Sequence, residues 1–88
     1  MKHVILDGET IHTREDLHRT LQEALCFPEW YGRNLDALHD VLTDISEKTV
    51  IGLIDLPVME EHLGDYAVYF LRVLKDCAQE NPHLYLLK

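Results

Sequence analysis

Residues 49–55 read Thr-Val-Ile-Gly-Leu-Ile-Asp, a short run that is apolar on both faces of an extended chain. Such a strand usually lies at the centre of a parallel sheet that helices cover. Two other short apolar segments, at residues 2–6 and 83–88, are predicted to be strands as well. The segments between the three have helical apolar spacing, and this alternation is typical of an α/β domain with a parallel sheet.

The first connection is predicted to contain two helices. One opens at Thr13, where Asp16 three residues later forms a shortened capping box. It should end near residues 26–27, because Pro28 restricts the backbone of the residue before it. Asn34 is a good N-cap for the second helix, which we expect at residues 35–45.

The second connection is predicted to contain a short helix at residues 58–63, started by Pro57, and a long helix at residues 66–80. Each long helix carries one apolar stripe at helical spacing. The stripes expected to be buried are Leu17, Leu21, Ala24 and Leu25 on the first, Leu35, Leu38, Leu42 and Ile45 on the second, and Ala67, Phe70, Leu71, Leu74 and Ala78 on the last.

Connections between parallel strands are right-handed, so strands in sequential order would place all the helices on the same side of the sheet. The sequence therefore predicts a two-layer α/β fold with one three-stranded parallel sheet. The helices would pack mainly on one face, and the other face would be only partly covered. At 88 residues the chain has room for one domain, residues 1–88.

The charge balance limits the classes of partner. Eight Lys and Arg stand against 16 Asp and Glu, a net charge of −8. This argues against nucleic-acid binding, which needs basic residues, and favours a basic partner, because opposite charges speed encounter. The start of the chain lacks a signal-peptide pattern and no apolar run is long enough to span a membrane, so we expect a cytoplasmic protein with no membrane partner.

Motifs for catalysis or cofactor binding are absent from the sequence, and no cofactor is expected. Two cysteines, Cys26 and Cys77, are too few for a disulfide scaffold and are interpreted as reduced core or edge residues. A metal site needs three or four convergent ligands. The six histidines fall in different predicted elements, so none is expected to form such a site; they are His3, His12, His18, His39, His62 and His83.

The most informative segment is residues 30–40. Asp36 and Asp40 are four residues apart on one helix, where like charges repel each other. A stripe of Asp36, Asp40 and Thr43 should face water, either as a solvated acidic surface or as a binding surface. Trp30 and Tyr31 just before it can either pack in the core or belong to an interface, where exposed aromatics beside charges are common.

Two stretches resemble the barstar family, intracellular inhibitors of the ribonuclease barnase. They are residues 17–21, Leu-His-Arg-Thr-Leu, and residues 28–40, Pro-Glu-Trp-Tyr-Gly-Arg-Asn-Leu-Asp-Ala-Leu-His-Asp. The resemblance extends over nearly the whole chain. It implies a two-layer α/β fold with strand order 1-2-3 and no enzymatic activity. It also implies an immunity-type function, in which a monomer binds one basic barnase-like ribonuclease or nuclease toxin domain.

The same resemblance implies which residues bind the nuclease. Asp40 matches the acid that inserts deepest into the nuclease active site, Asp36 matches a second acid, and Trp30 stands at an aromatic stacking position. His39 replaces an interface tryptophan, and Arg33 brings a positive charge where the family archetype is acidic. The full expected set is Trp30, Gly32, Asn34, Leu35, Asp36, Ala37, His39, Asp40, Thr43 and Asp76.

Two other functions use the same residues. Asp36, His39 and Asp40 could form an acid–base group of an enzyme, although no nucleophile or oxyanion-binding set accompanies them. The acidic face could also bind a partner that is not a nuclease, because a fold does not by itself determine a function.

Overall fold

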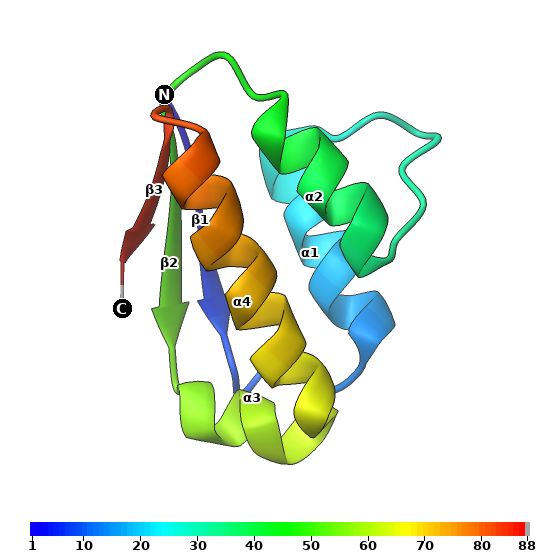
Figure 1. The fold of residues 1–88 in the computed structure, drawn as a ribbon. Coiled ribbons are helices and arrows are strands. Elements are labelled where there is room, and N and C mark those ends of the chain that lie inside the picture. The colour runs from blue at the N-terminus through cyan, green and yellow to red at the C-terminus, as the bar shows by residue number, and fades with distance from the viewer. Residues whose placement is uncertain (88) are drawn as a thin grey trace.

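The predicted architecture is confirmed in a computed structural model that describes residues 1–87 (Figure 1). Its elements are β1 (Lys2–Asp7), α1 (Arg14–Leu25), α2 (Leu35–Thr43), β2 (Thr49–Ile54), α3 (Leu56–Leu63), α4 (Asp65–Glu80) and β3 (Leu84–Leu87). The three strands form one parallel sheet in the order β1-β2-β3. The 49–55 segment is therefore the central strand, as its apolar character on both faces predicts.

Strand alternation separates a covered face of the sheet from an open one. Val4 and Leu6 of β1 point to the helices and are buried. On the face away from the helices, Ile5 pairs in register with Gly52, and Gly52 pairs with Leu87. The side chains on this open face are exposed, Ile5 to 60% and Leu87 to 59%. Figure 1 shows the helices gathered on one side of the sheet, so the expected two-layer arrangement with an open sheet face is confirmed.

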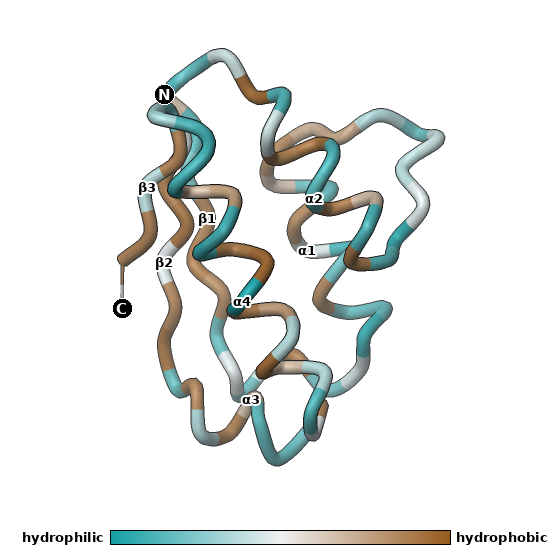
Figure 2. Tube along the Cα trace, viewed as in Figure 1, coloured by the Kyte–Doolittle hydropathy of each residue, from teal (hydrophilic) through white to brown (hydrophobic). Residues whose placement is uncertain are grey.

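The core lies between the sheet and helices α1, α2 and α4. It is built from the apolar stripes of the helices and from the inward-facing residues of the strands; Figure 2 shows the strands in brown and the surface turns in teal. Each fully buried large side chain contributes roughly 1.5–3 kcal/mol of transfer free energy. Those on the helices include Leu17, Leu21, Leu38, Leu42, Phe70 and Leu74.

The first helix buries three of its four predicted stripe residues, Leu17, Leu21 and Leu25, and differs at two positions. Ala24, expected in the apolar stripe, is exposed, and His18 is fully buried in the same helix. The buried face is rotated toward His18 because two tyrosine hydroxyls hydrogen-bond its ring nitrogens, which lets a polar side chain enter the core. The Thr13–Asp16 capping box at the start of α1 is confirmed.

Some element ends differ from the predicted ones. The second helix stops at Thr43, two residues earlier than expected, and β3 begins at Leu84. The buried Asn81 side chain explains the early end of α2, since its amide donates hydrogen bonds to the carbonyl oxygens of Leu42 (2.8 Å) and Ile45 (2.9 Å). The last residue of the predicted 83–88 strand lies outside the described residues.

The two cysteines are free and differ in environment. Cys77 is buried in α4, as expected for a core residue. Cys26 is exposed at the end of α1, where its left-handed backbone (φ 57°) turns the chain out of the helix. Within residues 1–87, the helices fall short of the length and apolar character that crossing a membrane requires.

Candidate functional site

The loop before α2 is tied closely to the first turn of that helix. The Asn34 side chain caps α2 by accepting a hydrogen bond from the Ala37 N–H (2.8 Å), and its amide donates to the Gly32 carbonyl oxygen (3.3 Å). A Cβ atom on Gly32 would lie 3.3 Å from the Ala37 Cβ, tighter than ordinary contact. A glycine therefore lets the loop approach the helix, and the capping positions the turn that carries Asp36.

The outer face of α2 is acidic. Asp36 and Asp40 are both exposed, one helical turn apart. Asp44 continues the same spacing at the end of the helix and is also exposed, although it was not among the predicted site residues. Thr43 is half-buried, and its hydroxyl donates to the carbonyl oxygens of His39 (2.8 Å) and Asp40 (3.2 Å), so the prediction that Thr43 faces water with the two acids is wrong in part.

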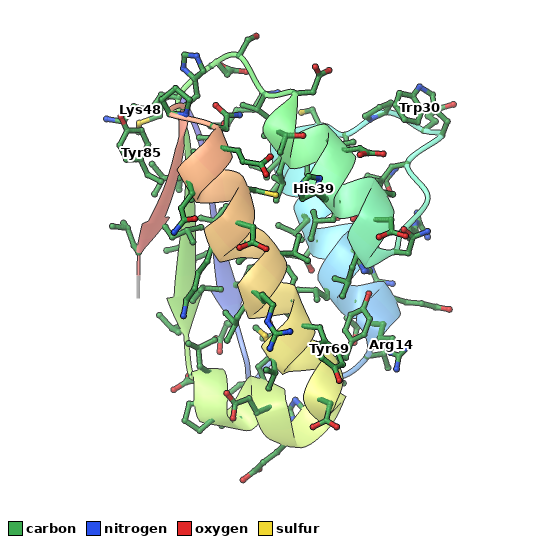
Figure 3. The ribbon with its side chains drawn as sticks, in the orientation of Figure 1. Arg14, Trp30, His39, Lys48, Tyr69 and Tyr85 are labelled. Atoms are coloured by element: carbon green, nitrogen blue, oxygen red, sulfur yellow. The ribbon has the colours of Figure 1, made fainter. Side chains whose placement is uncertain are left out.

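The two adjacent aromatic residues divide between surface and core. Trp30 is 79% exposed, whereas Tyr31 is only 4% exposed. In Figure 3, Trp30 lies at the outer end of the loop between α1 and α2. Its ring lines a hollow of about 200 Å³ together with Val41 and Ile45 of the α2 region. Trp30 is thus available to a partner, and Tyr31 belongs to the core.

A second group of polar side chains lies where α2 packs against α4. The His39 Nε2 atom is 3.6 Å from the Glu80 carboxylate (Figure 3 labels His39), and the Cys77 thiol donates to the His39 carbonyl oxygen at 3.9 Å. Burial, followed by the charges of Glu80 and Asp76, raises the pKa of the Cys77 thiol to about 11, so the thiol stays protonated. Asp76 is exposed on α4. Glu80 was missed from the sequence, although it follows Asp76 at the i, i+4 spacing that places both on one helical face.

The acid–base alternative does not match this geometry. An acid–base group needs its members within hydrogen-bond reach of one another. Among the ion pairs within residues 1–87, the one formed by His39 is with Glu80, and none joins His39 to Asp36 or Asp40. The helix therefore presents its two aspartates outward as separate carboxylates.

Taken together, most of the predicted residues lie on one helix and the loop before it. Leu35 and Ala37 are half-buried beneath the exposed positions of α2, and Asp76 comes from α4. Aromatic residues such as Trp are enriched at protein-binding surfaces, and exposed carboxylates give this surface the charge that complements a basic partner. The residues of this surface, called the acidic face below, are Trp30, Gly32, Asn34, Asp36, His39, Asp40, Asp44, Asp76 and Glu80.

Another acidic group lies away from this surface. Side-chain oxygens of Asp7, Glu9 and Asp55, at the ends of β1 and β2, come within 4.8 Å of one another. One oxygen of Asp7 already accepts a hydrogen bond from the Glu9 N–H (2.9 Å). Exposed acidic groups of this kind are common without a metal ion, and these residues belong to neither α2 nor its loop.

The structure is that of a small α/β protein with an exposed acidic surface on one helix. The chain matches the family described as barstar (barnase inhibitor) over residues 1–85. It is also 37% identical, over 89 residues covering 91% of this chain and 89% of the relative, to a protein of Bacillus subtilis (strain 168) named "Putative ribonuclease inhibitor YrdF". The chain therefore belongs to the barstar family, a family of inhibitors rather than of enzymes.

Proposed function

We propose that this protein inhibits a basic, barnase-like ribonuclease in the cytoplasm by covering the active site of the nuclease with the acidic face. The family match over residues 1–85 and the relative named a ribonuclease inhibitor support an inhibitory role. The identity of the partner as a barnase-like enzyme or nuclease toxin domain, and a complex of one inhibitor with one nuclease, are parts of the proposal.

The chemistry of a ribonuclease explains why carboxylates would block it. The active site of such an enzyme binds RNA phosphate through Arg, Lys and His side chains. Asp40 and Asp36 offer carboxylates in place of phosphate, and each can accept charge-assisted hydrogen bonds, including paired bonds from one Arg. A helix holds the two groups at a fixed separation, so little entropy is lost when they bind.

The edge of the acidic face differs from that of the family archetype and would select the partner. His39 beside Glu80 stands where an interface tryptophan is expected, and Arg33 places a positive charge next to the loop. These two differences suggest a nuclease whose surface around the active site differs from that of barnase. Their effect would fall on the choice of partner, because the two central aspartates are kept.

The observation that carries the proposal is the pair of exposed carboxylates, one turn apart, on a helix of a barstar-family protein. The test is a titration of the protein against a panel of barnase-like ribonucleases with RNA cleavage as the readout. Inhibition of at least one nuclease at a molar ratio of one supports the proposal. Full RNA cleavage by every nuclease, together with capture of a partner without nuclease activity from the cell of origin, would contradict it and favour a different binding function.

A further inference from the structure

A buried polar cluster joins three segments that lie far apart in the sequence. His18 of α1 is fully buried, with its Nδ1 atom 2.6 Å from the Tyr31 hydroxyl and its Nε2 atom 2.7 Å from the Tyr66 hydroxyl. Tyr31 belongs to the loop before α2, and Tyr66 to the first turn of α4. One imidazole ring therefore connects the loop of the acidic face to two helices of the core.

The three side chains of this cluster satisfy the hydrogen-bonding needs of the His18 ring without any other group. Burial, with a smaller contribution from the charge of Arg33, lowers the pKa of His18 to about 4, so its ring is neutral near pH 7. A neutral imidazole has one N–H donor and one acceptor nitrogen, and a tyrosine hydroxyl can donate or accept. Both ring nitrogens are thus satisfied in either tautomer, and removing one hydroxyl leaves a buried ring nitrogen without its partner.

Further hydrogen bonds hold the same loop against α1. The Tyr31 N–H donates to the Pro28 carbonyl oxygen (3.0 Å), which also accepts a hydrogen bond from the Gln22 side chain of α1 (3.0 Å). Gln22 in turn accepts one from the Arg33 side chain (3.1 Å). These contacts fix the backbone on both sides of Trp30, while the Trp30 ring itself stays exposed.

We infer that His18 is a positioning residue for partner binding. Through the Tyr31 hydroxyl it holds the loop at residues 29–33 in one conformation, and through the Tyr66 hydroxyl it is itself fixed to α4. His18 touches no partner, because it is buried, and acts through the loop that presents Trp30. A loop ordered in advance avoids the entropy cost of ordering it on binding. The identity of the partner rests on the function proposed above, but the order of the loop does not.

The direct test measures loop order in the free protein. Backbone ¹⁵N order parameters of Trp30 and Tyr31 should be about 0.85, the value of a rigid backbone. In Tyr31→Phe they should fall, and in Tyr66→Phe they should fall less, because His18 keeps its bond to Tyr31. Tyr69→Phe is the matched control: Tyr69 is a half-exposed residue of α4 (labelled in Figure 3), the ring nitrogens of His18 bond the other two hydroxyls, and loss of the Tyr69 hydroxyl should leave the loop unchanged.

Values below about 0.6 in the parent protein, or unchanged order in a folded Tyr31→Phe variant, would overturn the inference. Circular dichroism checks that each variant is folded. If Tyr31→Phe does not fold, the parent protein and Tyr66→Phe decide the result.

A second experiment tests whether the order of the loop affects nuclease binding. The dissociation constant for an inhibited ribonuclease should rise about two- to ten-fold in Tyr31→Phe, the effect of ordering one side chain at an interface, and stay unchanged in Tyr69→Phe. An unchanged constant in a Tyr31→Phe variant with a mobile loop would overturn the link to binding. If the parent protein inhibits no nuclease, the proposed function fails, while the order parameters still decide whether His18 positions the loop.

Discussion

Replacing His18 should remove a large part of the pH dependence of stability. In the folded protein, burial lowers the pKa of His18 from 6.5 to about 4. The unfolded chain takes up a proton at this residue as pH falls through 6.5, whereas the folded chain does so only near pH 4. Because the unfolded state binds more protons at this residue in this range, the contribution of His18 to the free energy of unfolding is greatest above pH 6.5 and declines as pH falls toward 4.

The size of the effect follows from the two pKa values. Over the whole range the loss approaches about 3 kcal/mol, at 1.36 kcal/mol per unit of pKa difference, and about 2 kcal/mol of it falls between pH 7 and pH 5. That interval lies above the range in which ordinary carboxylates titrate. The capping carboxylate of Asp16, whose pKa is lowered mainly by hydrogen bonds from the backbone of residues 12 and 13, titrates below it as well.

The assay is urea unfolding followed by circular dichroism between pH 7 and pH 5. His18→Gln should be less stable at pH 7, but it should lose about 2 kcal/mol less than the parent protein as pH falls. The matched control is His3→Gln, which changes an exposed histidine of the open sheet face and should keep the parent slope. Equal slopes for His18→Gln and the parent would refute the reasoning. If His18→Gln does not fold, an NMR titration of the His18 ring in the parent decides instead, and a midpoint near 6.5 would refute it.

Four further outcomes are expected. Association with a basic nuclease should slow as salt is added, because the attraction from the net charge of −8 is screened beyond about 10 Å at 0.1 M ionic strength; stopped-flow rates that stay flat would contradict this. Trp30→Ala should change the free energy of unfolding by less than about 0.5 kcal/mol in thermal melts, since the ring is exposed. The same variant should weaken nuclease binding, measured by calorimetry, by about 2 kcal/mol. Asn81→Ala should destabilise the protein by about 2 kcal/mol or more in urea unfolding, because buried carbonyl oxygens at the end of α2 lose their donor. Asn34→Ala, which removes an exposed helix cap, should cost only about 1 kcal/mol.

The fold could be predicted because its signals are local. The apolar run at residues 49–55, the helical spacing of the stripes and the capping residues Thr13 and Asn34 each act over a few neighbouring residues. Once three strands and their helical connections are placed, right-handed crossovers leave few arrangements. The exposed positions of Asp36 and Asp40 followed from the same periodicity.

The features that were missed depend on contacts over long stretches of chain. His18 was not expected in the core, because histidine is intermediate in its tendency to be buried and its two tyrosine partners lie 13 and 48 residues away in the sequence. The capping of α2 by Asn81 likewise joins residues 39 and 36 positions apart. Glu80 meets His39 only because α2 packs against α4. Periodicity indicates which face of a helix is apolar, but it does not pair polar groups across elements.

The most direct test of the proposed inhibition is the dissociation constant of Asp40→Ala for a ribonuclease that the parent protein inhibits. The expected loss is about 2–5 kcal/mol or more, the general cost of truncating one partner of a buried, hydrogen-bonded charge pair at an interface. Glu23→Ala is the matched control, because it removes one exposed negative charge from α1 that is not part of the acidic face, and it should leave the dissociation constant nearly unchanged. If Asp40→Ala binds and inhibits the nuclease as tightly as the parent and Glu23→Ala do, the acidic face of α2 does not block the nuclease active site.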